Sequence, residues 1–349
     1  MSNKDYWEKR AEENILAAEK IETRKVKIFE KLWNDCKEDV QDEIIKFYNK
    51  YSENNKFDFK DLFKILDEQE LQDFKEKAKR YNKKAVEENW QKLYQDQTLS
   101  LSLKKKVKRL EELQLVINYI LQENYEYEQL NFLNGLIETY ETVYNQSMYN
   151  LQTGLNVGVS FDKINREALE KIVKTSWIGS NYSDRIWQDK EKLINLLKQE
   201  LLKGFAMGEN PRKIAKRISK KMEVSKHNAE RLARTEFNHI ANEASFDCVN
   251  KINEYFGGGL FTEYKFLAAL DNRTSEDCRN LDGKIFSFKD KQVGVNFPPI
   301  HPNCRSTYKI ITRAGTVGKR IAKRLDTGEV EYIPSDMSYR EWEKKFLKE

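Results

Sequence analysis

Proline and glycine are scarce in the first part of this sequence. There is no proline before Pro211, and residues 1–150 contain a single glycine, Gly135. Because these two residues are the strongest helix breakers, their absence argues against frequent turns and leaves long helices as the default.

Long apolar runs and cysteine pairs are also missing. No run reaches the roughly 18 apolar residues of a membrane span, and the N-terminus is charged rather than signal-like, which predicts an unexported, soluble protein without a membrane partner. Cys36 and Cys248 stand alone in helical sequence, so that Cys278 and Cys304 remain as a candidate pair. This usage argues against a disulfide framework and favours a cytosolic, reducing compartment.

Charge of one sign is nearly balanced by the other. The 62 basic and 57 acidic residues leave a formal net charge of +5, which is too small to make a polyanion-binding protein by itself. With 34% charged and 39% apolar residues in a chain of 349, apolar side chains must gather on faces of helices in at least two folding units.

Apolar residues recur at steps of three and four, as on one face of a helix. Residues 51–63 form the expected loop, with Asp58 or a neighbour capping the next helix. Two glycines place a boundary or hinge near residue 155. The three stripes are Val26, Phe29, Trp33, Cys36, Val40, Ile44 and Phe47; then Leu103, Val107, Leu110, Ile117 and Leu121; then Leu133, Leu136, Tyr140, Val143 and Leu151.

The second half begins helical and then changes its pattern. Gly208 to Pro211 predicts a stop and restart, a further helix is expected to begin at Ser225, and "FGGGLF" (256–261) ends the helical region. Short strands are then predicted in 262–270, 283–288 and 306–312, with a last hairpin near residue 330. The predicted fold class is mostly α, with helices packed on a short antiparallel sheet in a small α+β C-terminal module.

Residues 271–306 concentrate the rarer side chains. The stretches "DNRTSEDCRNLDGKIF" (271–286) and "PPIHPNCRS" (298–306) hold two of the four cysteines, one of the three histidines and three of the five prolines. The Asp282-Gly283 pair predicts a tight turn.

These residues and a preceding helix resemble the phage Mu F-like head-morphogenesis family, over roughly residues 165–312. The residues that carry the resemblance are Arg234-Thr235-Glu236, Asn242, Asp271, Arg273, Thr274, Cys278, Leu281-Asp282-Gly283-Lys284, Pro299, His301, Pro302, Cys304 and Arg305.

The resemblance implies a minor head protein of a tailed phage or prophage. Such a protein is expected in the virion interior, and in the host cytoplasm during assembly, bound to the portal protein and to the major capsid or scaffolding protein. It would assist head assembly, DNA packaging or DNA delivery and would not be an enzyme. The expected domains are a portal- or capsid-contacting helical arm (1–155), the helical part of the Mu F-like domain (156–255), the β-containing module (256–315) and a basic tail (316–349).

Zn²⁺ is the one candidate cofactor. Many members of the family carry a cysteine where this chain has Ser275, which leaves Cys278, His301 and Cys304 as soft ligands. A fourth ligand would come from Asp271, Asp277, His239 or water. The alternative, which the missing cysteine favours, is that both cysteines are small buried groups and His301 hydrogen-bonds to the backbone.

A structural network is predicted from Arg234, Glu236, Asp271, Arg273, Asp282, Gly283 and Arg305. In it, Arg273 or Arg305 clamps a carboxylate, with Glu236 as one candidate. Replacing Arg273 by alanine is then expected to lower the melting temperature.

Two alternative functions stay open. A basic stretch with the character of a helix-turn-helix offers Lys213, Lys216, Arg217, Lys220 and Lys221 for sequence-independent DNA contacts, although a solvated helix face explains it as well. The other alternative is a metal-dependent enzyme or toxin-associated domain. Against it, the residues after 312 are too few for a catalytic domain of ordinary size, and no nucleophile elbow, phosphate loop or His-Glu-x-x-His motif is present.

Overall fold

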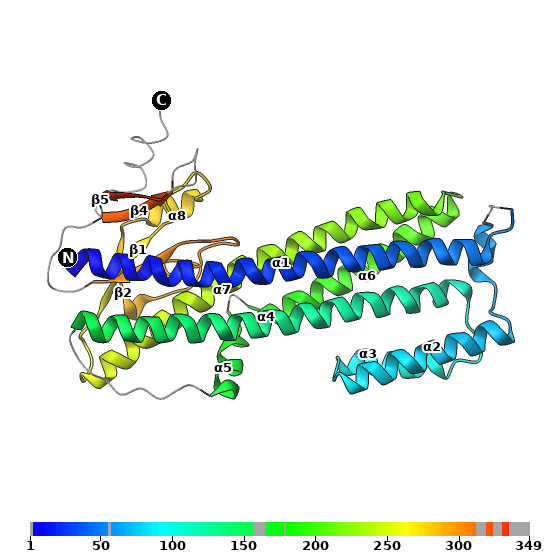
Figure 1. Cartoon of the computed structure of the whole chain (residues 1–349), viewed down its shortest axis with the longest axis horizontal. Coiled ribbons are helices and arrows are strands. Elements are labelled where there is room, and N and C mark those ends of the chain that lie inside the picture. Colours follow the sequence, from blue (N-terminus) through cyan, green and yellow to red (C-terminus); the bar gives the residue numbers. More distant parts are fainter. Residues whose placement is uncertain are drawn as a thin grey trace, which may run out of the picture. The chain divides into compact units, whose positions relative to one another are not determined.

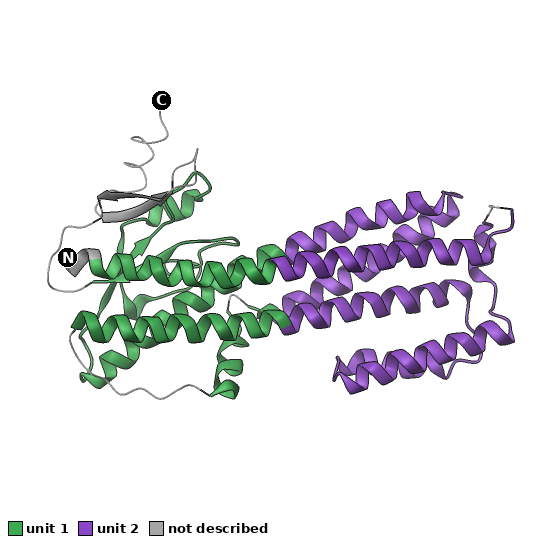
Figure 2. Cartoon of the chain, viewed as in Figure 1, with its two compact units in different colours: residues 1–26, 131–182, 230–349 green, residues 27–130, 183–229 purple. Residues whose placement is uncertain are grey.

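A computed structural model describes residues 3–54, 57–155, 165–177, 179–311, 319–323 and 330–334. Its elements are coloured along the chain in Figure 1. They group into two compact units, shown in Figure 2, each built from separate segments of the chain. Unit 1 comprises Met1–Val26, Asn131–Tyr182 and Glu230–Glu349; unit 2 comprises Lys27–Leu130 and Ser183–Ala229.

Long helices make up most of the described chain, as the scarcity of proline and glycine predicts. Helix α1 (Asn3–Tyr51) has 49 residues and α4 (Arg109–Leu155) has 47. Every member of the first apolar stripe, from Val26 to Phe47, is buried, Cys36 included. Helix α4 ends at Leu155, where the sequence places a hinge; residues 156–164 lie outside the described residues.

Between α1 and α4 lies a helical hairpin. The short 3₁₀ helix η1 (Phe59–Phe63) is capped by Asp58, as predicted, and α2 (Glu68–Glu87) begins with a capping box between Asp67 and Glu70. Helix α3 (Lys92–Ser102) packs against α2, where Asn82 Nδ2 donates to the Gln95 carbonyl at 2.6 Å.

The second apolar stripe is wrong at its first member. Leu103 is 71% exposed because α3 ends at Ser102 and α4 begins only at Arg109, so the residues between them do not continue one helix face. Val107, Leu110, Ile117 and Leu121 are buried as expected.

The helices of the second half include one uninterrupted helix where two were expected. After α5 (Arg166–Val173) and α6 (Tyr182–Ala206), helix α7 runs from Pro211 to Tyr255. Pro211 occupies the first turn as predicted, but the helix start at Ser225 is wrong, and with it the helix-turn-helix. No proline or glycine lies between Arg212 and Tyr255 to end the helix, and Ser225 is buried within it.

The glycine run after α7 turns the chain into a small sheet. Gly257, Gly258 and Gly259 all have positive φ, a backbone region that glycine enters without steric cost. The predicted strands are confirmed as β1 (Glu263–Leu267), β2 (Ile285–Ser287) and β3 (Thr307–Ile310).

The sheet is antiparallel with the order β2-β1-β3. Tyr264 is paired with Phe286 on one side and with Ile310 on the other. Between β1 and β2 lies the short helix α8 (Glu276–Leu281), and the 3₁₀ helix η2 (Phe288–Asp290) follows β2.

The last hairpin is also present, as β4 (Lys319–Lys323) paired antiparallel with β5 (Val330–Pro334). The other residues of the predicted basic tail, 316–318, 324–329 and 335–349, lie outside the described residues.

All four residues of β3 are buried, because both α7 and α1 contact this strand. From α7, Ser245 Oγ lies 3.4 Å from Tyr308 Oη. From α1, Glu8 forms a buried ion pair with Lys309. The Glu8 side chain is 0% exposed and the Lys309 side chain 4%. Unit 1 therefore holds the sheet between helical segments that are far apart in the sequence.

The four consecutive domains expected from the sequence stay a prediction, but the compact units divide the chain differently. Helices α1, α4 and α7 each contribute residues to both units, so neither unit is a continuous stretch. None of the helices described has the length and apolar composition of a membrane span.

Candidate metal centre and the loops that hold it

Cys278, His301 and Cys304 are brought together from two loops next to the sheet. Cys278 lies in the first turn of α8, where Ser275 is the N-cap and its Oγ accepts from the Cys278 N–H at 3.3 Å. His301 and Cys304 lie in the proline-containing loop that leads into β3. The convergence that the sequence predicted is thus present in unit 1.

The loop before β3 is held by one face of α7. Thr235 Oγ1 accepts from the Asn303 N–H at 3.0 Å, and Asn303 has a φ of 63°. Asn238 Nδ2 donates to the Ser306 carbonyl at 3.0 Å, and Asn242 Oδ1 accepts from Thr307 Oγ1 at 2.9 Å. Positions 235, 238 and 242 share one side of a helix, so the motif residues Thr235 and Asn242 act together as a docking face for the loop.

The three ligand atoms of the cluster face one another within 4.8 Å. The Cys278 and Cys304 Sγ atoms are 3.7 Å apart, and Cys278 Sγ lies 3.2 Å from His301 Nε2. Two sulfurs that bind one tetrahedral Zn²⁺ at about 2.3 Å lie about 3.8 Å apart. The sulfur spacing therefore fits a shared zinc ion.

The tautomer of His301 fits the same role. Its Nδ1 lies 2.8 Å from the carbonyl oxygen of Pro302, an acceptor, so Nδ1 carries the proton and donates. This leaves the lone pair of Nε2 directed at the cluster, in the arrangement that backbone carbonyls commonly impose on metal-binding histidines.

One of the two thiols is poised to ionise. The hydrogen bond from the Cys278 thiol holds the pKa of Cys304 below its ordinary value, against the effect of burial. The same bond, together with burial, raises the pKa of Cys278. A thiolate is the form of cysteine that binds metal, and the hydrogen bond between the two thiols favours its formation at Cys304.

Ser275 lies beside the three ligands, where a fourth metal ligand would be needed. Its Oγ lies 2.6 Å from His301 Nε2. The other candidates for a fourth ligand are not in the cluster: Asp277 is exposed, Asp271 is bound to Arg305, and His239 stacks on Trp177 at a ring distance of 4.3 Å. Three protein ligands thus fit Zn²⁺, with the Ser275 hydroxyl or water left for the fourth site.

Asp271 and Arg305 form the clamp expected in this module. The Arg305 guanidinium donates to both carboxylate oxygens of Asp271, with one of the two hydrogen bonds at 2.6 Å. Although burial alone would raise it, the pKa of Asp271 lies below its ordinary value because of Arg305. The Arg273 N–H also donates to Asp271 at 2.9 Å, so the carboxylate organises the turn after β1 as well.

Arg273 itself contributes little through its side chain. It is 73% exposed, and its guanidinium lies 3.7 Å from Asp271. Of the two arginines that the sequence offered for the clamp, Arg305 is therefore the one whose side chain holds the carboxylate.

The Asp282-Gly283 turn is confirmed. Asp282 Oδ1 accepts from the Ala268 N–H at 2.8 Å, and Gly283 has a φ of +78°. The Gly283 N–H donates to the Phe266 carbonyl at 3.0 Å, which ties the turn to β1. The left-handed conformation at residue 283 explains why glycine stands there.

Arg234 and Glu236 bind partners outside the Asp271 clamp. Arg234 Nε lies 3.5 Å from Glu22 Oε1 on α1, and Glu236 Oε2 accepts from Trp177 Nε1 at 2.9 Å. The carboxylate that Arg305 clamps is therefore not Glu236. The Arg-Thr-Glu sequence points in three directions, to α1, to the loop before β3 and to Trp177.

The basic residues proposed for DNA contacts are partly neutralised. Arg217 donates to Glu200 at 2.5 Å and also pairs with Glu209, while Lys213 lies 3.0 Å from Glu209 and Lys221 lies 3.9 Å from Glu200. Lys216 and Lys220 are exposed. This face of α7 is therefore a weaker phosphate-binding surface than the sequence indicates.

Sequence reasoning missed the buried pair of Lys309 and Glu8. A lysine in a short strand is ordinarily taken as solvent-facing, and the sequence contains no signal that α1 covers it. Asn238 was also missed, although its position three residues after Thr235 could have indicated a shared helix face.

Residues 195–309, which hold the Cys/His cluster, the clamp and the polar face of α7, match the family model for Phage Mu protein F like protein. This part of the chain is a Mu F-like region. The resemblance seen in the motifs is thereby confirmed.

Two curated relatives are similar to longer parts of the chain. Minor head protein GP7 of Bacillus phage SPP1 is 29% identical over 260 residues, which cover 69% of this chain and 80% of GP7. NAD(+)–arginine ADP-ribosyltransferase EFV of Enterococcus faecalis is 26% identical over 223 residues, or 64% of this chain and 43% of EFV. The chain thus spans less than half of the second relative. No solved structure matches the chain.

Proposed function

We propose that this Mu F-like protein is a minor head protein of a tailed phage or prophage. The observation that carries the proposal is the similarity to GP7. Its sequence identity is low, but the alignment covers 69% of this chain and 80% of GP7. We infer a virion location, with binding to the portal protein and the inner capsid surface, and a part in head assembly, DNA packaging or DNA delivery.

The geometry of the module supports a structural rather than an enzymatic role. Its motif residues are engaged with one another: Asp271 with Arg305, Thr235 and Asn242 with the loop before β3, and Asp282 with β1. Side chains used in this way hold two loops and a sheet together. They make a rigid body suited to contact larger partners.

We also propose that Cys278, His301 and Cys304 hold a structural Zn²⁺. When bound, the ion would crosslink α8 to the loop before β3, which the sulfur spacing and the histidine tautomer allow. The role is stabilisation of the module.

Quantitative mass spectrometry of purified virions and procapsids from the source phage tests the proposed function. We expect a small, reproducible ratio of this protein to the portal subunit, and a lower amount in heads assembled without portal. An unchanged amount in portal-less heads would assign binding to the capsid shell instead, and absence from both particles would overturn the virion role.

A further inference from the structure

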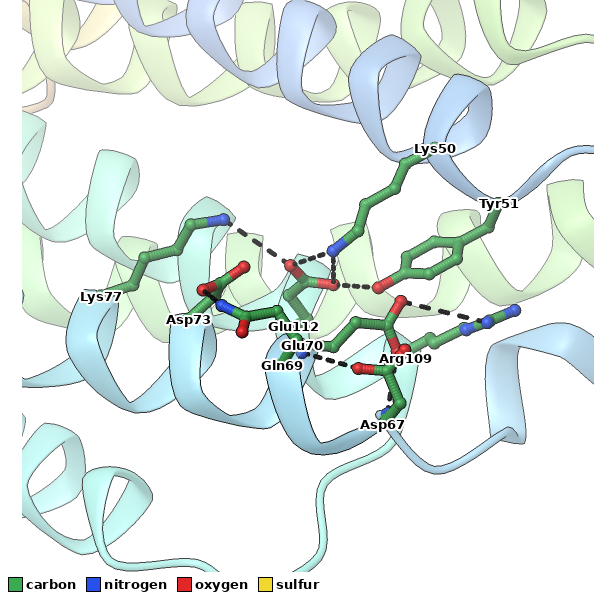
Figure 3. A network of polar contacts seen from close by, with 9 residues as sticks. All are labelled: Lys50, Tyr51, Asp67, Gln69, Glu70, Asp73, Lys77, Arg109 and Glu112. Atoms are coloured by element: carbon green, nitrogen blue, oxygen red, sulfur yellow. Dashed lines mark hydrogen bonds and ion pairs between the residues drawn. The ribbon is translucent and has the colours of Figure 1, made fainter.

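A cleft of ≈ 320 Å³ lies within unit 2, bordered by residues of α1, α2 and α4. This volume is at the lower end of the range for small-ligand pockets. At its floor, Glu112 accepts from Tyr51 Oη at 2.6 Å and from Lys50 Nζ at 3.0 Å. Figure 3 shows Lys50 and Lys77 directed at Glu112 from opposite sides.

The walls combine cations with apolar and aromatic groups. Lys46 and Lys50 lie one turn apart on α1, and Lys77 and Arg80 lie three residues apart on α2, so each pair shares a helix face toward the cleft. The apolar part of the lining comes from Phe47, Tyr81, Leu113 and Val116, all of which are buried.

The cleft carries more positive than negative charge. Its four cations face two carboxylates, Glu43 and Glu112. Lys46 pairs with Glu43 at 2.7 Å, whereas Lys50 and Lys77 share Glu112 at 3.0 and 3.6 Å.

Arg80 lies over the Tyr81 ring at 5.6 Å and forms no ion pair with a carboxylate in the described ranges. Two positive charges therefore remain uncompensated at the cleft. The basic face of α7 also keeps a positive excess over Glu200 and Glu209, but Lys216 and Lys220 lie on an exposed helix surface rather than in a cleft with an aromatic wall.

We propose that this cleft binds a phosphate monoester of about nucleotide size, either a free nucleotide or the 5′-terminal phosphate of a nucleic-acid strand. A phosphate monoester carries about two negative charges at neutral pH, which match the excess, whereas each phosphodiester or carboxylate group carries one. Arg80 can donate two parallel hydrogen bonds to it, and the aromatic wall can take the organic part. The inference is independent of the proposed virion role.

Isothermal titration calorimetry with the full chain tests this proposal. The probes are inorganic phosphate, deoxyadenosine 5′-monophosphate, deoxyadenosine, and one short oligonucleotide with and without a 5′-phosphate. We expect the monophosphate to bind and the nucleoside not to bind. Tighter binding of the 5′-phosphorylated strand than of its 5′-hydroxyl form identifies nucleic acid as the source, and binding of the mononucleotide alone identifies a free nucleotide.

Substitutions locate the site. Lys77→Gln and Arg80→Gln are each expected to weaken binding at least about tenfold, because each removes one charge-assisted hydrogen bond. Lys46→Gln, at a side chain that is 69% exposed, is a third variant. It lowers the net positive charge of the cleft by one, so it is also expected to weaken binding. The matched controls are Lys216→Gln and Lys220→Gln, which remove the same charge from the exposed face of α7 in the same unit.

Three results would overturn the proposal. They are the absence of binding by every phosphate probe, equal binding of the nucleotide and the nucleoside, and a loss of affinity in the α7 variants as large as in the cleft variants. The melting temperature of each variant should stay at the wild-type value, and Lys46→Gln decides the outcome if Lys77→Gln or Arg80→Gln unfolds.

Discussion

Glu128 is a carboxylate enclosed in the helical core of unit 2, and we predict that it makes the stability of this unit fall as pH rises. Its side chain accepts from Trp33 Nε1 at 2.8 Å, and the residue is 2% exposed. Burial raises the pKa of Glu128 to about 8; the Trp33 hydrogen bond opposes this effect, and the charge of Asp189 adds to it.

The sign follows from proton counting. Between the ordinary pKa of 4.5 and the folded pKa of about 8, the folded state keeps a proton that the unfolded state has lost. The stabilising contribution is therefore fully present below about pH 4.5 and is lost as pH rises through about 8. At about 1.4 kcal/mol per pH unit, the free energy of unfolding falls by at most about 5 kcal/mol over this window.

Glu128→Gln should remove this dependence. The glutamine carbonyl still accepts from Trp33 but carries no charge at any pH. Urea unfolding followed by tryptophan fluorescence from pH 5 to pH 9 should give a flatter pH profile than wild type and higher stability at pH 9. Burial also raises the pKa of Glu22 in unit 1 to about 7. Its effect on the pH dependence of stability is the same in wild type and in Glu128→Gln.

Glu87→Gln is the control, because Glu87 lies on α2 of the same unit with a side chain that is 62% exposed. Its profile should parallel that of wild type. The reasoning would be refuted by an equal pH slope in wild type and Glu128→Gln, since Glu128 would then titrate alike in the folded and unfolded states.

Three further predictions concern unit 1. Arg305→Ala should lower the free energy of unfolding by about 3 kcal/mol in chemical denaturation, since it removes the cation from a buried carboxylate, whereas Arg273→Ala should cost less than about 1 kcal/mol; equal effects would refute the clamp assignment. Ser275→Cys should raise Zn²⁺ affinity at least about tenfold in a chelator competition and Cys304→Ser should abolish binding; an unchanged affinity in Ser275→Cys would mean that residue 275 does not face the metal. Lys309→Met should destabilise the chain by about 3–5 kcal/mol, and adding Glu8→Gln should restore part of this loss, which a lack of recovery would contradict.

Much of the secondary structure follows from local sequence. Steps of three and four from Val26 to Phe47 correctly predict a buried helix face, and Pro211 and the run of three glycines mark where helices begin and end. Such features act through the backbone of neighbouring residues, so they can be read without a tertiary structure. The failure at Ser225 has the same cause: an N-cap residue begins a helix only where the preceding residues are not already helical.

The three residues of the candidate metal centre could be predicted from the sequence, but the ion pairs and hydrogen bonds around it could not. The density of rare residues in 271–306 indicates that Cys278, His301 and Cys304 converge. The partner of Arg305 and the partners of Arg234 and Glu236 could not be chosen, because several carboxylates and cations at different sequence distances compete for each of them. Only their positions in space decide which pairs form.

By itself, then, the sequence determined a helical chain, a short C-terminal sheet and the resemblance of one region to the Mu F-like family, because helix breakers, strand periods and ordered motifs are local properties. The tertiary structure decided which distant segments share a unit. It buried Lys309 against Glu8 and placed Lys50 and Lys77 around Glu112, contacts that span 301, 62 and 35 positions along the chain. Pairings over such separations depend on how whole helices pack, and no local pattern in the sequence specifies that packing.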